Sequence, residues 1–391
     1  MNNTESIPTV NVLFICGSLE PGRDGVGDYT RLLAGELISQ GNRATMLAMN
    51  DRMIKTVVSK SQTVGSHKIQ TLRLPSGLKN KKRIELAKAF ISEHQPDWLS
   101  LQFVIYAYNL KGLPFSLGKT FNSIGADKSW HIMFHELWIG MDASSSLKNK
   151  LIGRIQKRII KNLLTVLKPI SIHTQTELYM KKLNEIGSQS NYLPLFSNIP
   201  LYNLEKVNLK TRYDFPNHQI NFILFGHIHP GSYIDTFAKE ITSFAKGNSI
   251  KISLTTIGRN GAELRKWKKI CDKYGLILNE FGEQSAKTIS KQLANADIGI
   301  TTTPLIQSQK SGTIAAMHAH GLPIICISKQ WQVKNYKPKN TPKIRPYRKG
   351  RFTKAFFQFP QLEDETSRYS INKVAQILLN DLTKSESSGY S

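Results

Sequence analysis

The sequence is poor in cysteine and contains no long apolar run. Its three cysteines, Cys16, Cys271 and Cys326, stand far apart without metal-ligand spacing. Such cysteines are typical of small core residues in a reducing compartment, so we expect neither disulfides nor a zinc site. No apolar run reaches the roughly 18 residues that a membrane-spanning helix needs. The polar start "MNNTESIPT" also lacks the apolar stretch of a signal peptide, which favours a cytoplasmic location.

The signatures of metal-dependent chemistry are missing as well. No Asp-x-Asp triplet stands beside a glycine-rich loop, and the histidines lack the spacing of zinc ligands. We therefore expect no bound metal and no resident cofactor. The charge of an anionic substrate would have to be met by side chains and by helix N-termini, whose free N–H groups suit an anion.

Acidic residues are scarce. The chain has 28 acidic and 53 basic residues, which gives a net charge of +25, and residues 148–168 and 329–354 hold seven and ten basic residues without an acid. Such a field favours nucleic acid, anionic lipid or a phosphate-bearing substrate. Nucleic acid is the least favoured partner because the basic segments lack the regular aromatic spacing of stacking platforms.

Short apolar runs alternate with helical patterns along the whole chain. In the first half we predict strands at residues 10–16, 44–48, 69–74, 98–103, 131–134 and 170–173 and helices at residues 29–39, 83–94, 147–167 and 177–185. In the second half we predict strands at residues 220–225, 252–257, 276–280, 298–302 and 324–327 and helices at residues 233–244, 262–274, 285–295 and 312–320. Strands that alternate with helices predict parallel sheets with helices on both faces.

The sequence thus predicts an α/β protein with two doubly wound, Rossmann-like domains and a cleft between them. We expect a first domain at residues 1–200, a second at residues 201–365, and a helix at residues 366–391 that packs back toward the first and ends in a loose tail. Ligands of parallel sheets bind beyond the carboxyl ends of the strands. The loops at residues 17–28 and 225–232 follow the first strand of each domain and are candidate binding loops.

The first of these loops, "GSLEPGRDGVGD", is rich in glycine. Gly25, Val26 and Gly27 would let a ligand approach the backbone, because glycine has no side chain to obstruct it. An ordinary turn between a strand and a helix explains the same residues, and the loop alone does not decide between the two.

Five motifs follow one another in an order that points to a family. The opening "GSLEPGRDGVGDYTRLLAGEL" is followed by "FHELW", "FGHIHPGS", "FGEQSAKTISKQLANADIGITTTP" and "AAMHAHGLPII". Over residues 11–327 this series resembles the GT-B fold glycosyltransferases, in particular the retaining family 4 type. The first motif is similar to their Gly-Gly-Val-Gly turn, and "FHELW" is similar to their histidine-bearing loop.

The resemblance implies a metal-independent glycosyltransferase that moves a sugar from a nucleotide-sugar donor to an acceptor with retention of configuration. The acceptor would be a glycan, a lipid-linked saccharide or another anionic molecule. Gly25, Val26 and Gly27 would lie against the acceptor and the donor phosphates, and His135 would contact the sugar as the catalytic residue. A structural role at the end of a strand is the alternative for His135.

The sequence departs from the family's pattern at the donor site. His227 and Ser232 stand where the family has an Arg and a Lys, and Ser308 and Ala316 stand where it has two glutamates. A lysine with hydroxyls at a helix N-terminus would still make a diphosphate cradle. The candidate donor-binding residues are Gly226, His227, His229, Arg259, Lys310, Ser311, Gly312 and Thr313.

Other interpretations stay open. The altered donor positions also fit a GT-B domain that has lost catalysis and binds a glycan or a partner, and the same scaffold could carry a different activity, such as a sugar-nucleotide epimerase.

Residues 147–168 form a basic amphipathic pattern. Leu147, Leu151, Ile155, Ile159, Leu163 and Leu167 recur at helical spacing, and Lys150, Arg154, Lys157, Lys161 and Lys168 line another face. Such a helix can lie in an anionic membrane interface, which would place the protein on the inner face of a membrane. A helix packed on the core with a charged outer face explains the same pattern.

Overall fold

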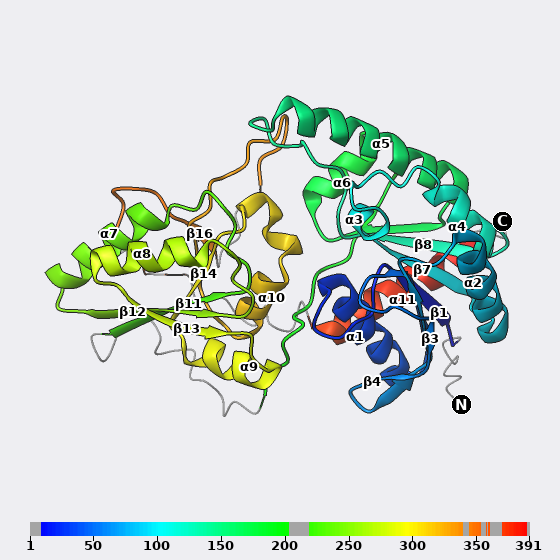
Figure 1. Ribbon diagram of the computed structural model, residues 1–391, viewed down its shortest axis with the longest axis horizontal. Coiled ribbons are helices and arrows are strands. Elements are labelled where there is room, and N and C mark those ends of the chain that lie inside the picture. The colour runs from blue at the N-terminus through cyan, green and yellow to red at the C-terminus, as the bar shows by residue number, and fades with distance from the viewer. Residues whose placement is uncertain are drawn as a thin grey trace, which may run out of the picture. The chain divides into compact units, whose positions relative to one another are not determined.

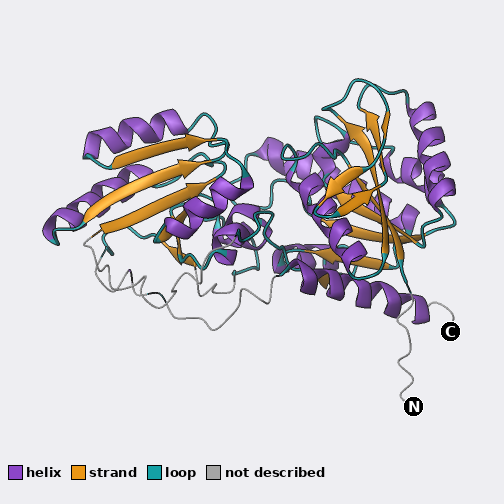
Figure 2. Cartoon of the chain, turned by 90° about the horizontal axis from the view of Figure 1, so that it is seen from below, coloured by secondary structure: helices purple, strands orange, loops and turns teal. Residues whose placement is uncertain are grey.

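The computed structural model describes residues 9–202, 219–338, 344–352, 357, 359 and 370–388. The chain divides into unit 1, Met1–Pro194 with Ile371–Ser391, and unit 2, Leu195–Ser370. Each unit is built on its own sheet with helices around it (Figures 1 and 2). Parts of the expected boundary at residues 194–207, of the basic segment at residues 329–354 and of the C-terminal tail lie outside the described residues.

The sheet of unit 1 has eight strands in the order β10-β9-β8-β7-β1-β2-β6-β3. Their bounds are β1 (Asn11–Cys16), β2 (Arg43–Asp51), β3 (Val58–Ser59), β6 (Thr71–Pro75), β7 (Trp98–Phe103), β8 (Ser129–Phe134), β9 (Ser171–Thr174) and β10 (Asn191–Tyr192). Neighbouring strands pair in parallel except β3, which is antiparallel to β6. Every residue of β1 is buried, which explains why this strand reads as a continuous apolar run. A separate hairpin joins β4 (Gln62–Val64) and β5 (His67–Ile69).

The helices of unit 1 cover its sheet in two groups. Their bounds are α1 (Gly25–Ser39), α2 (Asn80–His94), α3 (Ile105–Tyr108), α4 (Leu117–Gly125), α5 (Leu147–Leu167), α6 (Glu177–Asn184) and α11 (Ile371–Ser388). The crossover through α1 leads from β1 toward one edge of the sheet, and the crossover through α2 leads back past β1 toward the other. Right-handed crossovers in opposite directions place these helices on opposite faces. Accordingly α4 packs between α2 and α5, whereas α1 packs against α11.

The last described helix, α11, joins unit 1 although it follows unit 2 in the chain. Its buried side chains Val374, Ala375, Leu378 and Leu382 recur at helical spacing. The Gln40 side chain donates to the Asn372 carbonyl at 3.1 Å, which ties the start of α11 to the end of α1.

The sheet of unit 2 has six parallel strands in the order β13-β12-β11-β14-β15-β16. Their bounds are β11 (Gln219–Phe225), β12 (Lys251–Ile257), β13 (Ile277–Gly282), β14 (Ile298–Thr301), β15 (Ile324–Cys326) and β16 (Ile344–Pro346). The helical elements are α7 (Ile234–Gly247), α8 (Leu264–Tyr274), α9 (Ala286–Asn295), the 3₁₀ helix η2 (Leu305–Lys310) and α10 (Gly312–Ala319).

Two apolar clusters fill the two faces of this second sheet. One contains Phe237 of α7 and Trp267 of α8, and the other contains Leu293 of α9 and Met317 of α10. Strand β11 contributes to both clusters because successive side chains of a strand point to opposite faces. The predicted class, two doubly wound parallel-sheet units of Rossmann type, is confirmed. None of the helices in the described part of the chain is long and apolar enough to cross a membrane.

Candidate functional site

The glycine motif forms the first turn of α1. The helix begins at Gly25, and Asp24 caps it by accepting a hydrogen bond from the Gly27 N–H at 2.7 Å. A Cβ atom on Gly27 would lie 2.5 Å from the Ser18 carbonyl oxygen, whereas a Cβ atom on Gly25 would meet nothing within 4 Å. The expectation that Gly25, Val26 and Gly27 form a loop is therefore wrong, because the cap and this close backbone packing draw them into the helix.

The segment before this turn is held by a buried carboxylate. Asp51, at the end of β2, accepts from the Ser18 hydroxyl at 2.9 Å and from the Arg73 Nε at 2.7 Å. Arg73 also pairs with Glu20 in the same segment. Burial favours the neutral form of Asp51, but the hydrogen bonds, led by the one from Arg73, outweigh it and lower the pKa of Asp51. The sequence pattern did not reveal this anchor.

His135 lies directly after β8 and is 6% exposed. Its backbone N–H donates to the Phe103 carbonyl at 3.1 Å, and its Nε2 lies 2.9 Å from Gln102 Oε1. The ring of Tyr29, from the first turns of α1, meets the imidazole edge-on with 4.9 Å between the ring centroids. Unit 1 therefore brings the predicted catalytic histidine next to the helix that the glycine motif begins.

The bond to Gln102 is the first of a chain that runs through the core of unit 1. The Gln102 Nε2 donates to Ser100 Oγ at 2.8 Å, and Ser100 Oγ lies 2.8 Å from His131 Nδ1. His131 Nε2 lies 3.0 Å from His173 Nδ1, and His173 Nε2 lies 2.9 Å from Asp381 Oδ2 on α11. We call these residues, from His135 to Asp381, the histidine chain.

The two ends of the histidine chain fix the donors there. An ionised Asp381 only accepts, so His173 donates from Nε2. The Gln102 amide nitrogen donates to Ser100, so its Oε1 accepts from His135 Nε2. The hydrogen bond with His173 lowers the pKa of Asp381, and burial with the neighbouring imidazoles holds the pKa of His131 well below its usual range.

Candidate donor residues of unit 2 meet at the carboxyl ends of β11 and β14. Gly226 follows β11 with φ +86°, and its carbonyl accepts from the Asn260 side chain at 2.8 Å. A Cβ atom on Gly226 would lie 2.6 Å from Thr313 Cγ2, so the loop after β11 touches the first turn of α10. A glycine is needed here both for the positive φ and for this approach.

Two imidazoles and a lysine gather beside this contact. The rings of His227 and His229 lie edge to face with 5.2 Å between their centroids. The His229 N–H donates to Thr302 Oγ1 at 2.9 Å. Burial, then the charges of His227 and Lys310, lowers the pKa of His229, so Lys310 at the end of η2 lies near His229.

The N-terminus of α10 completes the group. Ser311 caps the helix by accepting from the Ile314 N–H, and its hydroxyl lies 3.1 Å from Thr313 Oγ1. A Cβ atom on Gly312 would meet nothing within 4 Å, so the first residue of α10 is uncovered within unit 2. Ser308 and Ala316 are both buried.

Arg259 lies on the loop after β12, between Gly258 and Asn260, which both approach Gly226. Its Nε lies 3.7 Å from Glu283 Oε2, and both side chains are more than half exposed. An exposed pair of this length binds its cation weakly. The structure therefore brings Gly226, His227, His229, Lys310, Ser311, Gly312 and Thr313 together and gives Arg259 a surface ion pair.

The fold is that of GT-B glycosyltransferases. The Anabaena protein HepE in complex with UDP and glucose superimposes with a TM-score of 0.59 at 13% identity, over 96% of this chain and 99% of the other. A glycosyltransferase from Rickettsia africae superimposes with 0.56 at 11% identity, over 96% and 94%. The catalytic domain of starch synthase IV from Arabidopsis thaliana, bound to ADP and acarbose, superimposes with 0.53 at 11% identity, over 97% and 100%.

Sequence comparison gives no relatives to set beside these structures. No protein-family model matches the chain, and no curated protein matches it in sequence. Among the described residues, no group of three or more His, Cys, Asp or Glu side chains is placed to hold a metal ion.

Proposed function

We propose that this protein transfers a glycosyl group from a nucleotide-sugar donor to an acceptor hydroxyl. The observation that carries the proposal is the group at the N-terminus of α10, where Thr313 touches Gly226 at the carboxyl edge of a parallel sheet and Lys310 and Ser311 directly precede the helix. Structures with the same fold hold UDP or ADP. The leaving nucleoside diphosphate needs positive charge and N–H donors, and this group supplies both.

Each residue of the group has a distinct task in this proposal. Lys310 acts as a point charge on the diphosphate, the hydroxyls of Ser311 and Thr313 donate to its oxygens, and the end of α10 adds its partial positive charge. Gly226 and Gly312 leave the backbone accessible to the phosphates. His135 contacts the transferred sugar, and the transfer proceeds with retention and without a metal, as the family resemblance implies.

Titration of the full-length protein with UDP, ADP and GDP tests the donor site. Lys310→Ala should weaken nucleoside-diphosphate binding by about 1.5–3 kcal/mol, since a charge-assisted hydrogen bond is lost. Lys291→Ala removes the same charge from an exposed position on α9 and should leave binding unchanged. Equal affinities of the wild type and Lys310→Ala would remove Lys310 from the site.

The chain also supports a second candidate, a GT-B domain that binds a sugar nucleotide or glycan without turnover. Ala316 has no polar side-chain atom and stands where the resembling family has a glutamate, which favours this alternative. Release of nucleoside diphosphate from a panel of nucleotide sugars separates the two. Binding of a nucleotide sugar without release, in the presence of glycan and lipid-linked acceptors, would support the binding protein.

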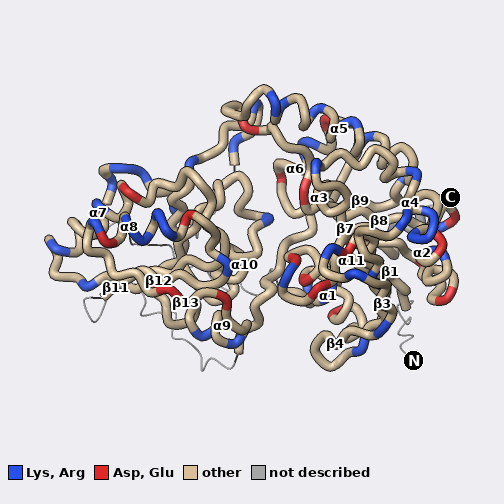
Figure 3. The backbone as a smooth tube through the Cα atoms, in the orientation of Figure 1, with Lys and Arg blue, Asp and Glu red and all other residues tan. Residues whose placement is uncertain are grey.

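We further propose that α5 binds an anionic membrane surface and so keeps the enzyme close to a lipid-linked acceptor. Five of its buried residues, Ile159, Ile160, Leu163, Leu164 and Leu167, pack on the core of unit 1. The opposite stripe begins with Leu147 and Leu151, which are 84% and 58% exposed. It continues with Arg154, Arg158 and Lys161, which are exposed. Figure 3 shows basic residues in blue along α5. We call these five exposed residues the α5 stripe.

A further inference from the structure

The loop between α3 and α4, residues 109–116, carries two apolar side chains that lie largely in solvent. Leu110 is 80% exposed and Phe115 is 68% exposed. Together with Leu147 of the α5 stripe, they are the most exposed large apolar side chains among the residues that the structure describes. Single exposed apolar residues are common, but several on one surface mark a binding site. We call residues 109–116 the α3–α4 loop.

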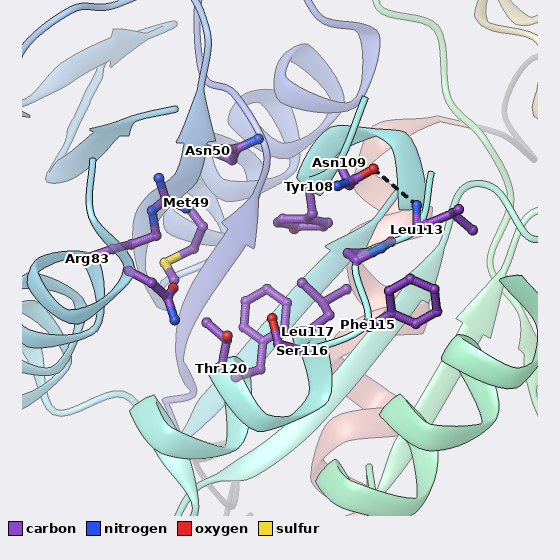
Figure 4. A pocket seen from close by; sticks show the side chains of 13 residues that line it. Met49, Asn50, Arg83, Tyr108, Asn109, Leu113, Phe115, Ser116, Leu117 and Thr120 are labelled. Atoms are coloured by element: carbon purple, nitrogen blue, oxygen red, sulfur yellow. Dashed lines mark hydrogen bonds between the residues drawn. The ribbon is translucent and has the colours of Figure 1, made fainter. Parts of the chain in front are cut away.

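Hydrogen bonds hold the α3–α4 loop in one shape. Asn109 Oδ1 accepts from the Lys111 N–H at 2.9 Å and from the Leu113 N–H at 3.3 Å, and Figure 4 shows the second of these bonds. The Gly112 N–H donates to the Asn109 carbonyl at 2.8 Å. Phe115 lies at the rim of a cavity of about 370 Å³ (Figure 4). The exposure of the apolar side chains is therefore a property of a formed turn.

This loop is joined to the middle of α5. The Gln156 Nε2 donates to the Gly112 carbonyl at 3.2 Å. A Cβ atom on Gly118, in the first turn of α4, would lie 3.1 Å from Asn162 Oδ1. These two contacts bring the end of the α3–α4 loop alongside α5, next to the α5 stripe.

The surface beside these contacts is basic. Arg158 and Lys161 of the α5 stripe lie between the two contact positions of α5, as Phe115 lies between the two glycines of the other segment. Lys111 and Lys119 are also exposed. Neither α5 nor the run from β7 through α4 contains an Asp or a Glu. Cations and apolar side chains therefore share one surface, which fits a partner that is anionic outside and apolar within.

We infer that the α3–α4 loop inserts Leu110 and Phe115 into the apolar layer of an anionic membrane, beside the α5 stripe. The inference rests on the membrane binding proposed for α5 and does not depend on glycosyl transfer. Most of the apolar face of α5 packs on the core, so the loop supplies the apolar contact that the cations of the stripe lack. Stable attachment takes two such signals, because one alone binds marginally.

A protein surface is the other kind of partner that exposed apolar side chains can meet. The centre of a protein interface is depleted of charge, whereas the two apolar side chains of the α3–α4 loop stand among lysines and arginines. The charges of this surface therefore favour the lipid headgroups of an anionic membrane.

A fluorescent label at position 115 tests the insertion directly. The native cysteines Cys16, Cys271 and Cys326 are buried, so Phe115→Cys offers an exposed thiol for nitrobenzoxadiazole. With vesicles rich in phosphatidylserine, the label should shift its emission to the blue, and lipids brominated on their acyl chains should quench it. Ile277→Cys is the matched control, because Ile277 is 63% exposed on β13 of unit 2, and its label should show neither change.

Removal of the two apolar side chains tests their contribution to binding. The double variant Leu110→Ser, Phe115→Ser should float with the same vesicles at least about tenfold more weakly than the wild type, because two apolar side chains no longer leave water. Its melting temperature should stay the same, since both side chains are largely exposed. Ile277→Ser removes an exposed apolar side chain from unit 2 and should leave flotation unchanged.

Quenching of the label at position 115 together with weaker flotation of the double variant supports the inference. Flotation of the wild type without quenching, or equal flotation of the wild type and the double variant, overturns it and leaves the α5 stripe standing. An emission shift that brominated lipids do not quench would place the loop against protein and also overturns it. A wild type that floats with no vesicle overturns the loop and the α5 stripe together, whereas release of nucleoside diphosphate tests glycosyl transfer separately.

Discussion

At the scale of single residues, Gly25 and Gly27 look alike in the sequence but stand in opposite environments. Gly25 faces open space, whereas Gly27 lies so close to the Ser18 carbonyl that a Cβ atom would overlap it. The first glycine keeps the N-terminus of α1 open, and the second lets the helix pack on the segment after β1.

The pair supplies a prediction with its own control. Gly27→Ala should lower the free energy of unfolding by about 1–3 kcal/mol, the usual cost of overpacking, despite the better helix propensity of alanine. Gly25→Ala should be neutral or stabilising. Urea denaturation followed by tryptophan fluorescence measures both, and equal stability of the two variants would contradict the close approach of Gly27 to Ser18.

At the scale of the secondary-structure elements, α11 is attached to unit 1 by a polar contact inside an apolar interface. The Asp381 carboxylate binds His173, which is fully buried, and Asn191 of β10 donates to the same oxygen at 3.2 Å. The histidine chain therefore depends on a helix from the far end of the sequence.

Asp381→Asn should destabilise unit 1 by about 1–3 kcal/mol at neutral pH, because a hydrogen bond to an ionised group is replaced by a neutral one. The pKa of Asp381 is lower in the folded protein, so its stabilisation is complete above the unfolded value of about 3.9 and is lost as the pH falls below it. The difference in the free energy of unfolding between wild type and variant should therefore shrink from pH 5 to pH 3, a range set by the reference pKa of about 3.9. Urea denaturation at fixed pH values measures it.

Asp235→Asn is the control for this experiment. Asp235 makes an exposed ion pair with Lys273 at 3.3 Å, so its loss should cost little stability. A difference for Asp381→Asn that is no larger than that of the control, or that persists unchanged at pH 3, would show that the carboxylate does not stabilise the attachment of α11.

At the scale of the whole molecule, the net charge of +25 is the dominant electrostatic feature, and α5 concentrates part of it on one exposed stripe. The sequence predicted an apolar face that runs the length of this helix. In the structure, Ile159, Leu163 and Leu167 of that face are buried in the core. Leu147 and Leu151 are the members of the face that are largely exposed. Membrane binding by α5 then has to rely on the cations of the α5 stripe.

Vesicle flotation tests this. The wild type should float with vesicles rich in phosphatidylserine and not with neutral vesicles, because each cation near an anionic surface adds roughly 1 kcal/mol. The triple variant Arg154→Gln, Arg158→Gln, Lys161→Gln should bind at least about tenfold more weakly. The same change at Arg265, Lys266 and Lys269, exposed on α8, serves as the control. Equal flotation of the two triple variants would exclude the α5 stripe.

Several elements of the fold were not predicted because they leave little pattern. Five strands have only two or three residues, which is too few for a hydrophobic periodicity to be recognised. They are β3, β4, β5, β10 and β16. Helix α4 begins after a proline-containing loop and has only nine residues. The longer elements were predicted close to their observed bounds, and α5 and β7 match them.

The sequence by itself determined the class of fold, because strands and helices that are buried over their length must carry apolar residues at the period of their geometry. It also indicated the loop after β11 and the start of α10 as a candidate donor site, because ligands of parallel sheets bind beyond the carboxyl ends of the strands. Only the tertiary structure decided that Gly27 packs against Ser18 and that Asp381 ends the histidine chain. These contacts join residues that lie far apart in the sequence; His173 and Asp381 are separated by 208 positions. No local sequence pattern encodes which distant polar groups meet once the apolar surfaces are buried.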